Sequence, residues 1–172
     1  MGNYFLMSTR FNKKKASDFG LLEIEGTDSA INPIDKTLWK KCTLYDYGWG
    51  RENGYCKTPI LEYDGLLELI LSSSQEDDVY GAAAIILDKY PDELLETCER
   101  MSCCENKTIE FKKMTSVFQL HLGINHSPII GKTVEEIEKD SYRWRAISNI
   151  AKEKKHRWPL LSWLKYSSNP FN

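Results

Sequence analysis

The sequence predicts a mainly α protein, an antiparallel stack of helices that follows an irregular or partly β N-terminal segment. Three observations predict this fold. Apolar residues recur at helical spacing from residue 60 onward. Polar capping residues and prolines mark the ends of the periodic segments, and the connections between the central segments are only a few residues long. Short connections favour antiparallel neighbours.

The central segments justify the first helices. Thr58 is a candidate N-cap and Pro59 suits the first helical position, where its missing N–H costs nothing. Ser74 can cap a second helix, whose acidic first turn, Gln75-Glu76-Asp77-Asp78, suits the positive end of the helix dipole. Pro91 ends this helix and opens a third. The small residues of the run 81–84 would let a neighbouring helix approach closely.

This pattern resembles one unit of a HEAT-type helical repeat over residues 60–90, about 30 of the 172 residues. A leucine-rich first helix, an acidic turn before a Val and an alanine cluster stand in the expected order: Leu66 to Ile70, Glu76 to Val79, Ala82 to Ala84 and Leu87. Tyr80 departs from the family, because an Arg usually follows the Val. The resemblance implies antiparallel helix packing. The alternative is two ordinary amphipathic helices that are rich in alanine.

The remaining elements complete a single domain of three parts, residues 1–57, 58–123 and 124–172. A helix over 106–122 stops at Gly123, and a helix over 133–156 opens with a capping box of Thr133 and Glu136. A short helix over 159–166 follows. The first part has one predicted strand, 20–25, and a short helix at 35–41. The segment 43–56, rich in Gly and aromatic residues, is predicted to be an ordered loop or a hairpin. Whether residues 1–57 form a sheet stays open.

Composition and charge limit the class of protein. A hydrophobic content of 41% and a charged content of 28% are typical of a soluble globular chain, and no apolar run approaches the ~20 residues of a membrane helix. The basic cluster 13–15 follows the apolar N-terminal residues, the reverse of the order in a signal peptide. We therefore expect a cytoplasmic protein with no membrane partner.

Charge is spread unevenly along the chain. Residues 60–110 hold 13 acidic and 3 basic side chains, a net charge of −10, while residues 132–166 hold 9 basic and 5 acidic ones, a net of +4. Either the acidic and basic helices pack together or face solvent, or they form a docking surface for a partner of opposite charge.

Familiar catalytic and cofactor motifs are absent. The chain has no nucleotide-binding glycine loop, no zinc-protease motif and no nucleophile elbow. Gly131-Lys132-Thr133 resembles the end of a phosphate loop, but His126 stands where that loop needs its first glycine. The helix N-terminus at Thr133 could still bind an anion. We expect no cofactor and nominate no catalytic residue.

These limits favour a non-catalytic domain that binds a basic protein. The chain is similar, at the level of class only, to small bacterial immunity or antitoxin-like proteins. The expected binding surface joins the acidic helices to the aromatic loop: Tyr45, Tyr47, Trp49, Asp77 and Asp78. One alternative is a nucleic-acid-associated regulator that uses the C-terminal basic helix, with Arg143, Arg145, Lys152, Lys154, Lys155 and Arg157. Another is an enzyme with an unrecognised carboxylate site. Partner identity and oligomeric state stay open.

The cysteines give the first testable prediction. Cys98, Cys103 and Cys104 could bind zinc with His121 or His126, but no Cys-x-x-Cys pair exists and adjacent cysteines chelate poorly. We expect protein purified without chelators to hold far less than one zinc per chain by elemental analysis. One tightly held zinc per chain would contradict this and identify these residues as ligands.

Overall fold

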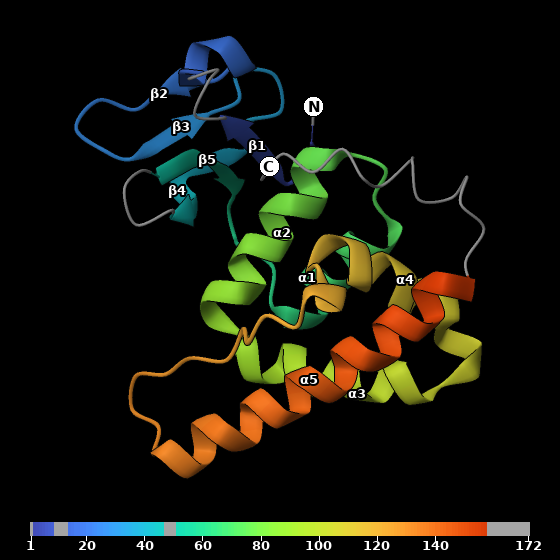
Figure 1. Ribbon diagram of the computed structural model, residues 1–172. Coiled ribbons are helices and arrows are strands. Elements are labelled where there is room, and N and C mark those ends of the chain that lie inside the picture. Colours follow the sequence, from blue (N-terminus) through green and yellow to red (C-terminus); the bar gives the residue numbers. More distant parts are fainter. Residues whose placement is uncertain (1, 9–13, 47–50, 158–172) are drawn as a thin grey trace. The chain divides into compact units, whose positions relative to one another are not determined.

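A computed structural model describes residues 2–8, 14–46 and 51–157 of the chain. Within these residues the chain forms five α-helices, three short 3-10 helices and five β-strands. The elements divide into two compact units, Met1–Asp88 and Lys89–Asn172 (Figure 1). The expectation of a mainly α helical stack is wrong, because the first unit is built on an antiparallel sheet. The resemblance of residues 60–90 to a HEAT unit and the single-domain assignment stay predictions.

The sheet occupies most of the segment that the sequence left irregular. Its strands follow the spatial order β1-β5-β4-β3-β2, and each neighbouring pair is antiparallel. The strands are β1 (Phe5–Ser8), β2 (Leu22–Glu23), β3 (Ser29–Ile31), β4 (Leu38–Asp46) and β5 (Arg51–Lys57). The helix expected at 35–41 is wrong, because Asp35 lies in a turn where its carboxylate accepts hydrogen bonds from Thr37, and β4 begins at Leu38.

One face of the sheet has its own small core. Successive residues of a strand point to opposite faces, so Leu6 and its cross-strand partner Tyr55 share a face. They are buried with Trp39, Ala30 and the short 3-10 helix η1 (Ala16–Phe19) in one hydrophobic cluster. The rings of Phe19 and Tyr55 meet edge to face, with centroids 6.1 Å apart. This cluster stabilises the sheet, because it buries apolar residues from four of the strands together with those of η1.

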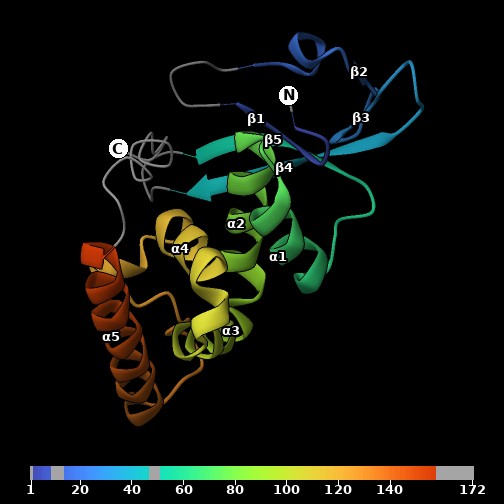
Figure 2. The same cartoon turned by 90° about the vertical axis from the view of Figure 1, so that its right-hand side faces the viewer.

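Two helices complete the first unit, α1 (Tyr63–Ser72) and α2 (Glu76–Lys89). The helix expected to start at Pro59 begins instead at Tyr63, with Glu62 as N-cap, and the Thr58–Pro59 peptide bond is cis. α2 lies against β1 (Figures 1 and 2). A Cβ added at Gly81 would overlap the ring of Phe5. The small residue at this position therefore admits a strand, where the sequence predicted a neighbouring helix.

A buried carboxylate fastens β1 to the first turn of α2. The Asp78 side chain is fully buried and accepts three backbone N–H groups, from Asn3 (2.9 Å), Tyr4 (2.8 Å) and Phe5 (3.0 Å). These donors lie at the edge of the sheet, where they have no further strand to bind. The carboxylate thus satisfies groups whose burial without a partner would cost free energy.

The second unit is helical. It contains α3 (Pro91–Cys103), η2 (Glu105–Lys107), α4 (Thr108–Val117), η3 (Leu120–Leu122) and α5 (Val134–Arg157). α3 packs against both α4 and α5 (Figure 2). The helix expected over 106–122 is interrupted at Gln119, whose φ of 53° is left-handed, while Gly123 has a φ of 73° and ends η3 as predicted. The predicted short helix over 159–166 falls outside the described residues.

The Asp78 contacts give a stability prediction with a matched control. Asp78→Asn replaces one acceptor oxygen by an N–H₂ group that faces a backbone donor, so we expect it to lower the free energy of unfolding by about 2–4 kcal/mol. Asp77→Asn, which makes the same chemical change one residue away at a half-exposed position, should alter stability by less than about 0.5 kcal/mol. Urea unfolding followed by circular dichroism measures both, and equal stabilities would refute the anchoring role.

Candidate functional site

The carboxylates of α1 and α2 form the clearest charged surface of the first unit. Residues 59–88 hold seven acidic side chains and no Lys or Arg. Apart from the buried Asp78 these side chains are exposed or half-exposed, and we call five of them the acidic surface: Asp64, Glu68, Glu76, Asp77 and Asp88. None of the five forms an ion pair with another residue in the described ranges. Their charge therefore faces solvent.

The five residues expected to bind a partner differ in their exposure to solvent and in whether the structure describes them. Asp77 is half-exposed and belongs to the acidic surface, but the expectation that Asp78 is exposed is wrong, because its carboxylate is fully buried against β1. Tyr47 and Trp49 lie outside the described residues, and so does the side chain of Tyr45. The sequence alone does not reveal this role of Asp78, because the N–H groups that its carboxylate binds stand more than 70 residues earlier in the chain.

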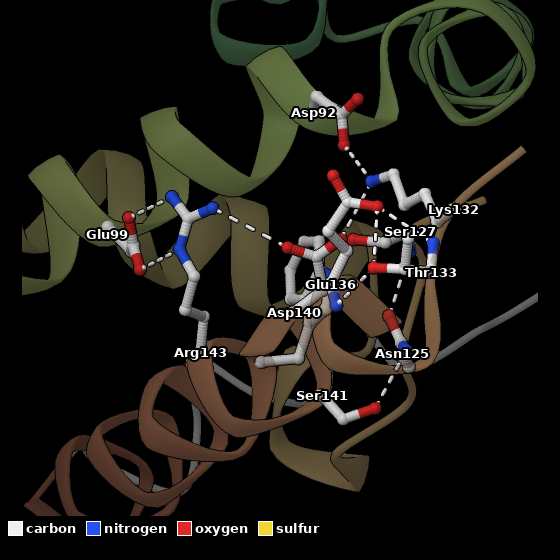
Figure 3. Close-up of polar contacts among 11 residues, drawn as sticks. Asp92, Glu99, Asn125, Ser127, Lys132, Thr133, Glu136, Asp140, Ser141 and Arg143 are labelled. Atoms are coloured by element: carbon white, nitrogen blue, oxygen red, sulfur yellow. Dashed lines mark hydrogen bonds and ion pairs between the residues drawn. The ribbon is translucent and has the colours of Figure 1, made fainter. Parts of the chain in front are cut away.

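In the second unit, by contrast, opposite charges neutralise one another (Figure 3). The Arg143 guanidinium of α5 donates two hydrogen bonds to the Glu99 carboxylate of α3, from Nε at 2.8 Å and from Nη2 at 2.6 Å. Such a two-point, charge-assisted contact is stronger than a single neutral hydrogen bond. Arg143 Nη1 also lies 3.7 Å from Asp140 Oδ1. Part of the predicted charge asymmetry is therefore used for packing α5 on α3.

Lys132 connects three segments of the same unit. Its ammonium group lies 2.7 Å from Asp140 of α5 and 2.8 Å from Asp92 of α3, while Lys132 itself belongs to the connector before α5 (Figure 3). These carboxylates raise the pKa of Lys132. Residues 131–133 resemble the end of a phosphate loop, but the lysine that would bind a phosphate in such a loop already binds two carboxylates here.

Further polar contacts hold the connector against α5. Trp144 Nε1 donates to Ser127 Oγ at 2.9 Å, and Asn125 Nδ2 lies 3.0 Å from Ser141 Oγ. The predicted capping box is present: Thr133 N–H donates to Glu136 at 2.8 Å and Glu136 N–H donates to Thr133 Oγ1 at 3.3 Å. These contacts hold the connector and the first turns of α5 together.

Two side chains of types that often act in catalysis, His126 and Cys98, are largely buried within the second unit. His126 stacks edge to face on Trp144, and burial lowers its pKa while its Nε2 lies 3.1 Å from the Phe118 carbonyl oxygen. Burial raises the pKa of the Cys98 thiol, so that thiol stays protonated. All five cysteines lie in the described ranges, where none is in a disulfide and no cluster of His, Cys, Asp or Glu could hold a metal ion.

The basic C-terminal helix is also partly occupied. Arg143 binds Glu99, and Lys154 donates to the Ser102 carbonyl at 3.0 Å while its ammonium lies 5.1 Å from the centroid of the Phe111 ring. Arg145 and Lys152 are exposed. The side chains of Lys155 and Arg157 lie outside the described residues. Two of the six predicted nucleic-acid contacts thus already have partners within the second unit.

Comparison with known proteins finds no matching family model and no match among curated proteins or solved structures. Among the described helices, none combines the length and the apolar character needed to cross a membrane. A function therefore has to be inferred from the surfaces and contacts of the chain itself.

The Arg143–Glu99 contact gives a pH-dependent prediction. Hydrogen bonding from Arg143 lowers the pKa of Glu99 below its ordinary value of 4.5. A carboxyl group whose pKa is lower in the folded chain than in the unfolded chain stabilises the fold at pH values above its unfolded-state pKa. This stabilisation is lost as pH falls through its folded-state pKa. We expect Glu99→Gln to lower the free energy of unfolding by about 0.5–1.5 kcal/mol at pH 7, since both side chains are partly exposed.

The deficit of Glu99→Gln relative to wild type should shrink as pH falls below the ordinary Glu value of 4.5, because the unfolded wild-type chain then binds a proton at Glu99 before the folded chain does. Asp92→Asn is the control, since Asp92 is mostly exposed and Lys132 keeps its contact with Asp140. It should cost less than about 0.5 kcal/mol. A Glu99→Gln deficit that stayed constant from pH 7 to pH 3.5 in urea unfolding would exclude the ion pair as its cause.

Proposed function

We propose that the chain is a non-catalytic protein-binding domain and that the acidic surface on α1 and α2 binds a basic protein, as a small immunity or antitoxin-like protein covers its target. The observation that carries this proposal is the contrast between the two units. In the second unit, acidic side chains of α3 bind Lys132 and Arg143. In the first unit the five carboxylates of the acidic surface have no cationic partner among the described residues.

Electrostatics explains why such a surface favours a basic partner. Like charges gathered on one side of a molecule raise the potential there and accelerate association with an oppositely charged protein. They also repel one another, which opposes folding, so an unneutralised cluster has a cost without a structural benefit. Helix-dipole stabilisation accounts for Glu76 and Asp77 in the first turn of α2. It does not account for Glu68 in the middle of α1 or for Asp88 near the end of α2.

The aromatic residues Tyr45, Tyr47 and Trp49 remain part of the proposed surface. An aromatic anchor supplies binding energy that exposed charges do not, because rim charges mainly change association rates and salt dependence. Asp78 is withdrawn from the surface because its carboxylate binds β1. Its neighbour Asp77 is retained.

The direct test compares charge-reversed baits in a pull-down from the source cell. Asp64 and Glu68 are exposed and stand four residues apart on one side of α1. We expect the variant Asp64→Lys/Glu68→Lys to lose most of a basic protein that wild-type bait captures at low salt. The control variant Glu25→Lys/Glu105→Lys makes the same total charge change at exposed positions that belong to neither helix, and it should retain that protein.

Salt dependence and protein identity decide the outcome. Captured protein should elute as ionic strength rises from about 0.05 to 0.5 M, because exposed charges are screened over this range, and mass spectrometry should identify a chain rich in Lys and Arg. Equal recovery by all three baits would remove the acidic surface from the proposal. Recovery of nucleic acid alone would favour the alternative, binding through the basic residues of α5.

A further inference from the structure

The outer face of α5 carries charges that the second unit does not use. One side of this helix is buried against the unit through Asp140, Trp144, Ile147, Ser148 and Ala151. The opposite side is exposed and carries Glu135, Glu138, Tyr142, Arg145, Ala146 and Asn149, which we call the outer strip. Tyr142 is 75% exposed although it is a large aromatic residue. α5 spans 24 residues, about 35 Å, so this strip is long.

Glu138 and Arg145 lack compensating charges on their own helix. Side chains interact along a helix at spacings of three and four residues. At those spacings Glu138 has Val134, Glu135, Ser141 and Tyr142, and Arg145 has Ser141, Tyr142, Ser148 and Asn149, so neither has an opposite charge. The two residues are themselves seven apart, about 10 Å along the axis. Neither makes an ion pair with another residue in the described part of the chain.

The helix dipole does not explain this arrangement. Its effect falls off within the first and last turns. Glu138 stands beyond the first turn of α5, and Arg145 stands 12 residues before the end of the helix at Arg157. The charges of the outer strip also separate by sign, since Glu135 and Glu138 precede Tyr142 and Arg145 follows it. An antiparallel copy of the helix would place the acidic half opposite the basic half.

We propose that the outer strip of α5 binds a second copy of this chain, with the two helices antiparallel and the two-fold axis at Tyr142. Such an interface is isologous, so each contact occurs twice. Glu138 stands four residues before Tyr142 and Arg145 three residues after it, on the same side of the helix. In this register the two tyrosine rings meet at the axis, and Glu138 of each copy lies within one residue, about 1.5 Å along the axis, of the level of Arg145 of the other copy. Glu135 faces Asn149.

This inference is independent of the proposed function, whose surface lies on α1 and α2. Charge complementarity selects the occupant, since a second copy supplies at the required spacing the opposite charges that Glu138 and Arg145 lack. The small Ala146 and the polar Asn149 beside the axis leave room for helices to approach to the usual 8–10 Å.

A charge swap tests the register. Sedimentation equilibrium of the full chain over about 1–200 µM should show a monomer–dimer equilibrium. Glu138→Arg and Arg145→Glu each place like charges opposite one another twice, so each should weaken the dimer at least about tenfold. The double variant Glu138→Arg/Arg145→Glu restores opposite charges and should return close to wild-type affinity. Glu105→Arg, an equal change at an exposed position of η2, should have no effect.

Cross-linking supplies a second measurement that does not depend on charge. In a Cys103→Ser background, which removes the exposed native thiol, Tyr142→Cys should form an interchain disulfide under mild oxidation. Glu153→Cys, also exposed, should not, because its two copies would stand about 33 Å apart in this register. A wild-type chain that stays monomeric to 200 µM would overturn the proposal. A dimer that the charge swap fails to restore, or that cross-links equally at both positions, would also overturn it.

Discussion

The carboxylate of Asp78 is the contact on which the first unit depends. It lies in the first turn of α2 and accepts the backbone N–H groups of Asn3, Tyr4 and Phe5. Those residues lead into β1, which stands at the edge of the sheet that the described residues form and pairs there with β5. A two-stranded attachment is weak by itself. Binding by a buried, charged acceptor supplies the second attachment and sets where α2 lies against the strand.

The absence of a side chain at Gly81 completes this arrangement. Gly81 stands three residues after Asp78, about one helical turn, so both face the same strand. The carboxylate draws the backbone of β1 toward α2, and the missing Cβ leaves space for the ring of Phe5. A helix normally loses about 1 kcal/mol for a central glycine relative to alanine. Here that cost permits burial of an aromatic side chain, which is only 2% exposed.

Local signals made the starts of α3 and α5 predictable, and distant pairings hid the sheet. α3 begins at Pro91 and α5 follows Thr133 because proline and capping residues act within one turn, so the sequence alone locates them. β4 and β5 carry Lys, Asn, Gly and Cys, and lack the clean alternation of a half-buried strand. Their place in the sheet depends on pairings such as Phe5 with Cys56, which join residues 51 positions apart.

The same distinction separates the acidic residues of the candidate site. Glu76, Asp77 and Asp78 look equivalent in a sequence, since any of them suits the first turn of a helix. Only the position of β1 shows that Asp78 is structural while its neighbours reach solvent. Likewise, only the packing of α5 and of the connector before it on α3 shows that Glu99 and Asp92 already have partners. Net charge along a chain therefore overstates the charge that a surface offers to a partner.

Salt should distinguish the two kinds of charge. Contacts such as Lys132 with Asp140 are largely covered by protein, so mobile ions screen them little. The carboxylates of the acidic surface and the charges of the outer strip face water, where a Debye length of about 10 Å at 0.1 M reduces their reach. Rising ionic strength should thus weaken binding through either exposed surface before it weakens the fold. Under both proposals, binding depends on exposed charges and is therefore more sensitive to salt than the fold is.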